Sequence, residues 1–236
     1  MLKRRGFKRI QKLDQLEEQW ANIIPRKFPA DDLDILKRVP VPVFFGIDQH
    51  TVAVHSAVGV EKIAKTYQVT SLNVNIDSVG FVVDADSNPS GRREALQTAL
   101  PKLFSGSSSQ QSPRAEIYVL PDNSSSGTLE DLLIRCGDIV YPTLMKSARS
   151  FIEEIDTNDS SIFAVGESKE LASPSGRGKA ILGCVANVLR PGKSIQVSIQ
   201  DNRWFRDDSV FEEPWVQKFQ LFVDRVVGGR SGEEER

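Results

Sequence analysis

The sequence predicts an α/β fold in which a mainly parallel central sheet is flanked by helices, with a helical C-terminal part. Two apolar runs, at residues 79–83 and 117–120, have the length and composition of buried strands. A helical pattern at residues 92–104 separates them. Strands and helices alternate from residue 51 to residue 134, which is typical of βα units. We therefore expect the two strands to be parallel neighbours, with the helix crossing over between them.

The first 38 residues are predicted to form a basic, helical extension. The segment from residue 1 to residue 12 is rich in lysine and arginine, and residues 13–24 have apolar side chains at helical spacing. Two prolines end that pattern, and a short helix is expected at residues 30–36. An extended segment follows to residue 45, then a strand at residues 51–54 and a helix at residues 59–67. Residues 72–76 fit either a short strand or an extended approach to the next strand.

The main domain is predicted to span residues 39–227. A polar loop is expected at residues 106–113, and a helix is expected to begin at residues 128–134. Further helices are predicted at residues 142–155, 179–189 and 215–227, whereas residues 161–171 are ambiguous. Residues 228–236 form a polar tail.

Composition excludes some classes of protein. The 236 residues include 39% hydrophobic and 26% charged side chains, with a formal net charge of −2, so no global basic field attracts nucleic acid. No apolar run approaches the length of a membrane span, and no signal peptide is visible, so we expect a cytoplasmic protein that is not in a membrane. The two cysteines and two histidines have no convincing metal-ligand spacing.

Acidic side chains follow both predicted strands. Asp84 and Asp86 come directly after the first strand, and Asp122 follows the second. The carboxyl ends of parallel strands meet at one sheet edge, where α/β proteins bind ligands. Carboxylates at that edge suit Mg²⁺ or Mn²⁺, although Asp is also common in the turns after strands. The paired occurrence favours a metal site made by these three residues.

Three more residues are candidates for the same site. Glu130 lies at the start of a predicted helix, where it is either a further metal ligand or an acidic residue that favours the helix dipole. Arg177 and Lys179 lie near another helix start, where free N–H groups attract phosphate. The alternative for this basic pair is a solvated turn.

These motifs, in this order, resemble a Toprim-related family of unknown function. The resemblance rests on V-D-A-D at residues 83–86, P-D-N at 121–123, G-T-L-E-D at 127–131, R-G-K-A at 177–180 and P-G at 191–192. It covers roughly residues 51–227. It implies a Toprim-like α/β fold in which the D-x-D pair binds Mg²⁺.

One part of the Toprim pattern is missing. Toprim domains use an upstream glutamate, in an apolar-strand E-G motif, as general acid/base. The apolar segment at residues 41–46 contains no glutamate. Asp48 is the nearest acidic substitute and therefore the weak candidate for a catalytic residue.

Two functions follow as expectations. The first is a metal-dependent protein of nuclease type, in which Asp84, Asp86 and Asp122 hold the ion and Arg177 and Lys179 neutralise a nucleic-acid phosphate. The second is a catalytically degenerate Toprim-like binding or regulatory module that keeps the fold without enzymatic activity. Whether the chain is an enzyme stays open, and so does whether it binds a protein partner or forms a homo-oligomer.

Overall fold

The computed structural model describes residues 1–10, 43–47, 50–57, 62–64, 66–67, 76–104, 112–159, 161–164, 166–193, 195–201 and 203–228. These residues form two compact units. One comprises Met1–Val83, Arg93–Ile117 and Gln220–Arg236, and the other comprises Asp84–Arg92 and Tyr118–Phe219. The expected helices at residues 13–24 and 30–36, the polar loop at residues 106–111 and the tail beyond residue 228 lie outside the described residues.

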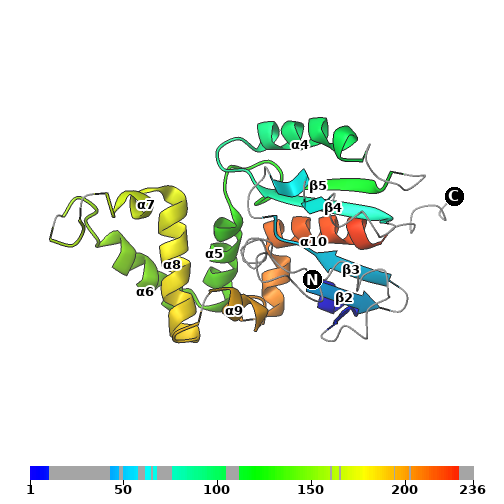
Figure 1. Ribbon diagram of the computed structural model, residues 1–236. Coiled ribbons are helices and arrows are strands. Elements are labelled where there is room, and N and C mark those ends of the chain that lie inside the picture. The colour runs from blue at the N-terminus through cyan, green and yellow to red at the C-terminus, as the bar shows by residue number, and fades with distance from the viewer. Residues whose placement is uncertain are drawn as a thin grey trace, which may run out of the picture. The chain divides into compact units, whose positions relative to one another are not determined.

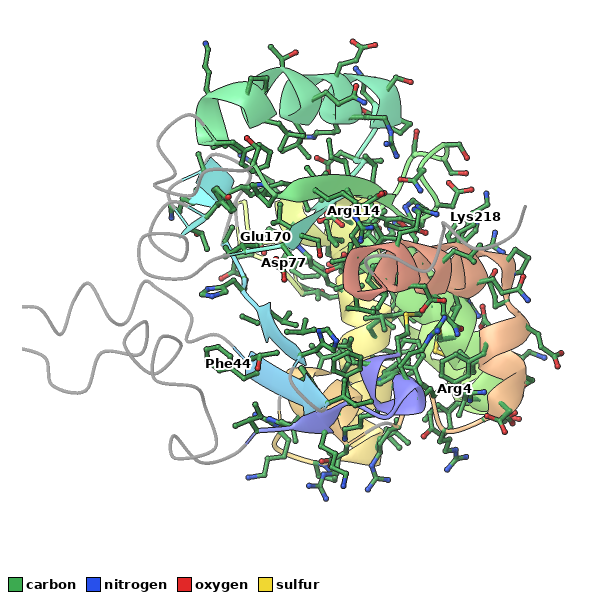
Figure 2. The ribbon with its side chains drawn as sticks, turned by 90° about the vertical axis from the view of Figure 1, so that its right-hand side faces the viewer. Arg4, Phe44, Asp77, Arg114, Glu170 and Lys218 are labelled. Atoms are coloured by element: carbon green, nitrogen blue, oxygen red, sulfur yellow. The ribbon has the colours of Figure 1, made fainter. Side chains whose placement is uncertain are left out.

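The central prediction, a parallel strand pair, is confirmed. Strand β4 (Ser78–Asp84) pairs with β5 (Arg114–Leu120), and the two run parallel. At their beginnings the Arg114 N–H donates to the Asp77 carbonyl at 3.0 Å, and both residues are labelled in Figure 2. At their ends the Ala85 N–H donates to the Leu120 carbonyl at 3.0 Å. Parallel pairing therefore brings the two strand ends to one edge.

The helix expected between these strands is α4 (Pro89–Phe104). It begins three residues earlier than its apolar pattern, because Asn88 Oδ1 accepts the Gly91 N–H at 2.9 Å and so caps the first turn. Leu96 and Leu103 are buried. Figure 1 shows α4 and the C-terminal half of α10 (Pro214–Val227) on opposite sides of the two strands.

The other face of β4 is shaped by a glycine. A Cβ on Gly80 would meet the Phe222 ring and Val226 of α10, each at 2.8 Å. The Ser78 hydroxyl also donates to the Val226 carbonyl. The absence of a side chain at Gly80 therefore lets this helix approach the strand closely.

The N-terminal strands differ from the expected βα arrangement. Strands β1 (Lys8–Arg9), β2 (Val43–Ile47) and β3 (His50–Val54) form an antiparallel sheet in the order β1-β2-β3. Only two residues separate β2 from β3, which permits a hairpin but no crossover helix. The basic N-terminal segment, expected as part of an extension, begins with the 3₁₀ helix η1 (Leu2–Arg5) and continues into β1. Residues 62–64 and 66–67 of the expected helix at 59–67 are helical.

The second unit is built from helices. Its elements are α5 (Leu129–Val140), α6 (Pro142–Glu153), α7 (Lys169–Ala172), α8 (Pro174–Leu189), α9 (Ile195–Gln200), η5 (Asp208–Glu212) and the beginning of α10. Helices α5, α6 and α8 pack against one another, as Figure 1 shows, around Leu133, Met145, Leu182 and Trp204. The helical C-terminal part is thus confirmed. No helix in the described part of the chain is long and apolar enough to cross a membrane.

Two helical glycines of this unit allow a matched stability test. Replacing Gly137 of α5 by alanine is expected to lower the free energy of unfolding by about 1–2 kcal/mol. Its Cβ would lie 2.7 Å from Met145 Sδ and 2.9 Å from the Trp204 ring, and the crowding outweighs the better helix propensity of alanine. In α8, a Cβ added at Gly183 would meet no neighbouring side chain or segment within 4 Å. Gly183→Ala should therefore raise the free energy of unfolding by up to about 1 kcal/mol. Urea unfolding measures both changes, and equal effects would contradict this packing.

Candidate acidic site

Asp84 ends strand β4 and meets the first turn of α5. Its Oδ1 accepts the Leu129 N–H at 2.9 Å, so a helix N-terminus faces the carboxylate. Burial raises the pKa of Asp84, and the charges of Glu130 and Asp86 raise it further. The Leu129 N–H and the Lys179 ammonium act in the opposite direction. Burial therefore contributes more to the raised pKa of Asp84 than repulsion by the neighbouring negative charges does.

Asp86 lies two residues beyond Asp84 in a left-handed backbone conformation, with φ of 51°. Its N–H and carbonyl pair with Gly127 across an isolated bridge, at 3.0 and 2.8 Å. Its side chain is exposed, and Oδ2 forms a 2.6 Å ion pair with Arg92 in the first turns of α4. Backbone hydrogen bonds therefore hold the D-x-D segment in place, while Arg92 binds one oxygen of the Asp86 carboxylate.

Helix α5 places Glu130 beside Asp84. Its N-cap, Thr128, forms a capping box with Asp131, whose Oδ2 accepts the Thr128 N–H at 2.8 Å. Asp131 thus has the capping role that acidic residues commonly have at helix starts. The carboxylate of Glu130 takes no part in the cap, and its negative charge acts on Asp84.

The two basic candidates lie on α8, but they do not lie on the same side of the helix. Arg177 and Lys179 are both exposed, and side chains two positions apart on a helix point in different directions. Between them, Gly178 is buried, and a Cβ there would lie 3.5 Å from the Glu130 Cβ. Lys179 is close enough to lower the pKa of Asp84, whereas Arg177 has no such effect on Asp84.

The expected free N–H groups of α8 are already used. The helix begins at Pro174, five residues before the predicted start, because Ser173 accepts the Gly176 N–H at 3.0 Å and caps it. The Arg177 N–H donates to the Ser173 carbonyl at 3.0 Å. An anion at this point would therefore meet the side chains of Arg177 or Lys179 rather than a helix N-terminus.

Asp122 is engaged elsewhere. Its side chain is only 6% exposed and accepts bonds from the Ser125 N–H at 2.7 Å and the Ser124 N–H at 3.1 Å. Lys218 of α10, labelled in Figure 2, donates to Oδ2 at 2.9 Å. Burial alone would raise the pKa of Asp122, but the bonds from Lys218, Ser125 and Ser124 together hold that pKa well below its usual range. The Asp122 carboxylate therefore stabilises its own turn and forms an ion pair with Lys218.

The structure therefore groups Asp84, Asp86 and Glu130 with Lys179, but it gives Asp122 separate partners. Among the residues described, no three or more His, Cys, Asp or Glu side chains are placed to hold a metal ion. The expected convergence of Asp84, Asp86 and Asp122 on one ion is thus not seen there. Asp48, the weak catalytic candidate, lies outside the described residues.

The chemistry of this acidic site suits a cation together with an anion. Mg²⁺ is usually held by one or two carboxylates, with water and substrate phosphate as the remaining ligands. Asp84 and Asp86 at one strand end fit that mode, which does not need a third protein carboxylate. Lys179 supplies positive charge near Asp84.

The raised pKa of Asp84 gives a prediction about stability. A half-buried acid whose pKa is higher in the folded state destabilises the fold once pH exceeds its unfolded pKa of about 3.9. Asp84→Asn keeps an oxygen for the Leu129 N–H and removes the charge. We expect the variant to be more stable than the parent at pH 7 and equally stable below about pH 4. Urea unfolding across this pH range measures the difference, and a variant less stable at pH 7 would contradict the prediction.

Sequence reasoning missed two partners of these carboxylates. The Leu129 N–H that binds Asp84 is signalled by the capping-box spacing of Thr128 and Asp131, which marks Leu129 as the first helical residue. Lys218, the partner of Asp122, lies 96 residues further along the chain, and no local pattern indicates it.

One of three comparisons with known proteins found a match. No curated protein and no solved structure matches the chain significantly. A family model described as a protein of unknown function, DUF3226, matches residues 33–226. That range covers most of the 236 residues and includes every residue of the acidic site. The chain therefore belongs to the DUF3226 family.

Proposed function

We propose that this DUF3226 protein is Toprim-like and binds Mg²⁺ or Mn²⁺ at Asp84 and Asp86 in order to engage a nucleic-acid phosphodiester. The observation that carries the proposal is Asp84 itself. It is a half-buried carboxylate at the end of a parallel strand, with the charges of Asp86 and Glu130 beside it. Such an arrangement destabilises the protein without a cation, so a function that uses the charge is the simplest reason for it.

Each nearby residue has a role in this proposal. Asp84 and Asp86 hold the ion, and Glu130 adds negative charge that strengthens its attraction. The bound ion would polarise the phosphodiester and stabilise the charge that develops on it. Lys179 neutralises the phosphate from α8. Arg92, which pairs with Asp86 at 2.6 Å, competes with the cation for one carboxylate.

The degenerate module remains the second candidate, and one observation favours it. Strand β2 has the sequence VFFGI, with no glutamate to act as general acid/base. A general acid/base typically contributes about 10²–10⁴-fold to a rate. We therefore infer that the chain binds nucleic acid but cleaves it weakly or not at all.

Titration calorimetry with Mg²⁺ and with Mn²⁺ tests the metal site. The parent should bind either ion, and the double variant Asp84→Asn plus Asp86→Asn should bind neither, because Asn lacks the charge that attracts the ion. Glu153→Gln plus Glu154→Gln, two exposed acids at the end of α6, is the matched control and should bind like the parent. Equal binding by the Asp84/Asp86 variant would show that the cluster is structural.

A cleavage assay separates the two candidate functions. The chain is incubated with single- and double-stranded DNA and RNA, in Mn²⁺ or in EDTA. We expect weak turnover or none. Robust metal-dependent turnover that Asp86→Ala abolishes would instead make the chain an enzyme.

A further inference from the structure

A surface cavity of about 330 Å³, open to solvent over much of its boundary, lies in the helical unit and involves none of the residues of the acidic site. It is lined by Tyr141, Asp201, Arg203 and Arg206. Pockets for small molecules typically have volumes of about 300–1,000 Å³, so this cavity is large enough for a small ligand. Its lining is polar and includes two arginines.

The backbone that presents Arg203 is fixed from three directions. Trp204 is fully buried, and its Nε1 donates to Ser198 Oγ at 2.8 Å. The Arg203 N–H donates to the Ser198 carbonyl at 3.1 Å, while the Tyr141 hydroxyl donates to the Arg203 carbonyl at 2.9 Å. The buried indole thus anchors the segment beside the cavity. A ligand would meet a backbone that is already in place, which reduces the entropy lost on binding.

The second arginine is also ordered. The Arg206 guanidinium carbon lies 4.6 Å from the centre of the Tyr141 ring, within the range of a cation–π contact. The bonds from Ser209 lower the pKa of the neighbouring Asp207, and the charge of Arg206 lowers it further. The Asp207 carboxylate accepts the Ser209 N–H at 3.0 Å and Ser209 Oγ at 2.7 Å, which caps η5.

The charge that remains at the cavity is positive. Asp201, the acidic residue of the lining, forms an ion pair with Arg190 at 3.0 Å. In the described part of the chain, neither Arg203 nor Arg206 forms an ion pair with a carboxylate. Two guanidinium groups are therefore available beside a carboxylate that Arg190 already neutralises.

We propose that this cavity binds a small phosphomonoester that carries hydroxyl groups. The planar guanidinium fork matches the oxygens of a phosphate and makes charge-assisted hydrogen bonds to it. The volume of about 330 Å³ exceeds the needs of a free phosphate ion, and Asp201 offers a carboxylate to a ligand hydroxyl. A phosphorylated sugar or a mononucleotide has both groups. This proposal does not rest on the metal site.

Titration calorimetry in low-salt buffer with EDTA tests this site without any metal. The probes are ribose 5-phosphate, adenosine 5′-monophosphate, inorganic phosphate and ribose. We expect the first two to bind, inorganic phosphate to bind more weakly and ribose not to bind. Arg203→Gln and Arg206→Gln should each weaken binding at least about tenfold, because each removes charge-assisted hydrogen bonds. Lys193→Gln, an exposed lysine outside the cavity lining, is the control and should bind like the parent.

The variants are expected to fold, because the contacts that fix Arg203 use its backbone atoms and not its side chain. Far-ultraviolet circular dichroism checks this for each one. Three results would overturn the proposal: no binding of either phosphomonoester, binding that both arginine variants retain, or binding of ribose as tight as that of ribose 5-phosphate. Failure of the Mg²⁺ titration would leave this result unchanged.

Discussion

Replacing Asp122 by alanine is expected to lower the free energy of unfolding by about 3 kcal/mol at pH 7. The change leaves the N–H groups of Ser124 and Ser125 without their acceptor and removes the partner of Lys218. Because the pKa of Asp122 is lowered in the folded state, the carboxylate stabilises the protein above its unfolded pKa of about 3.9. That contribution is lost as pH falls below this value.

Urea unfolding at pH 7 and at lower pH measures the effect. The parent and Asp122→Ala should converge in stability as the medium becomes more acidic than about pH 4. Lys218→Met is the companion variant and should cost less, because the lysine side chain is 47% exposed and the serine bonds to Asp122 remain. If instead Asp122→Ala abolishes Mg²⁺ binding with little loss of stability, Asp122 is a metal ligand as the sequence predicted.

Nucleic-acid binding by this chain is expected to weaken steeply with salt, because each phosphate contact releases counterions. If Arg177 and Lys179 both contact phosphates, Arg177→Gln plus Lys179→Gln should reduce the slope of log K against log salt by about 1.4 on single strands. The basic N-terminal segment, with exposed Lys8 and Arg9 in β1, should supply part of the slope that remains.

Fluorescence anisotropy of labelled single-stranded DNA and RNA, measured at several salt concentrations, gives these slopes. Lys146→Gln plus Lys193→Gln removes two exposed positive charges away from the acidic site and serves as the control, with a slope like that of the parent. A reduction of about half the expected size would indicate that Lys179 alone contacts phosphate, in agreement with its position beside Asp84. No retention of any nucleic acid at low salt would remove the nucleic-acid proposal.

Much of the described fold could be predicted because its signals are local. Strand β5 ends in a continuous apolar run at residues 117–120, α6 and α10 have one apolar face, and the helix start at Leu129 has a capping box. The sheet β1-β2-β3 could not be assigned in this way. Strand β1 has only two residues, both basic, and its pairing with β2 depends on contacts between segments far apart in sequence.

Only the part of the candidate site that depends on local sequence could be predicted. A strand that ends in D-x-D places Asp84 and Asp86 together whatever the rest of the fold does. The direction of Asp122 depends on its own turn, in which Asn123 has φ of 73° and its Oδ1 accepts the Val119 N–H at 2.9 Å. That geometry directs the carboxylate to Ser124, Ser125 and Lys218. Position after a strand therefore did not determine which carboxylates would share a site.

The order in which the units are completed follows from how the chain is divided between them. The first unit needs residues 220–228, whose contacts include the bond between Ser78 and Val226, 148 residues apart. Ribosomes synthesise a chain from its N-terminus at about 5–20 residues per second, so roughly 7–30 s pass between synthesis of β4 and synthesis of the helix segment that covers its Gly80 face. The helical unit ends at Phe219 and can therefore close first. Fragments cut anywhere before residue 220 should leave β4 with that face uncovered, and such fragments should be more prone to aggregate than the full chain.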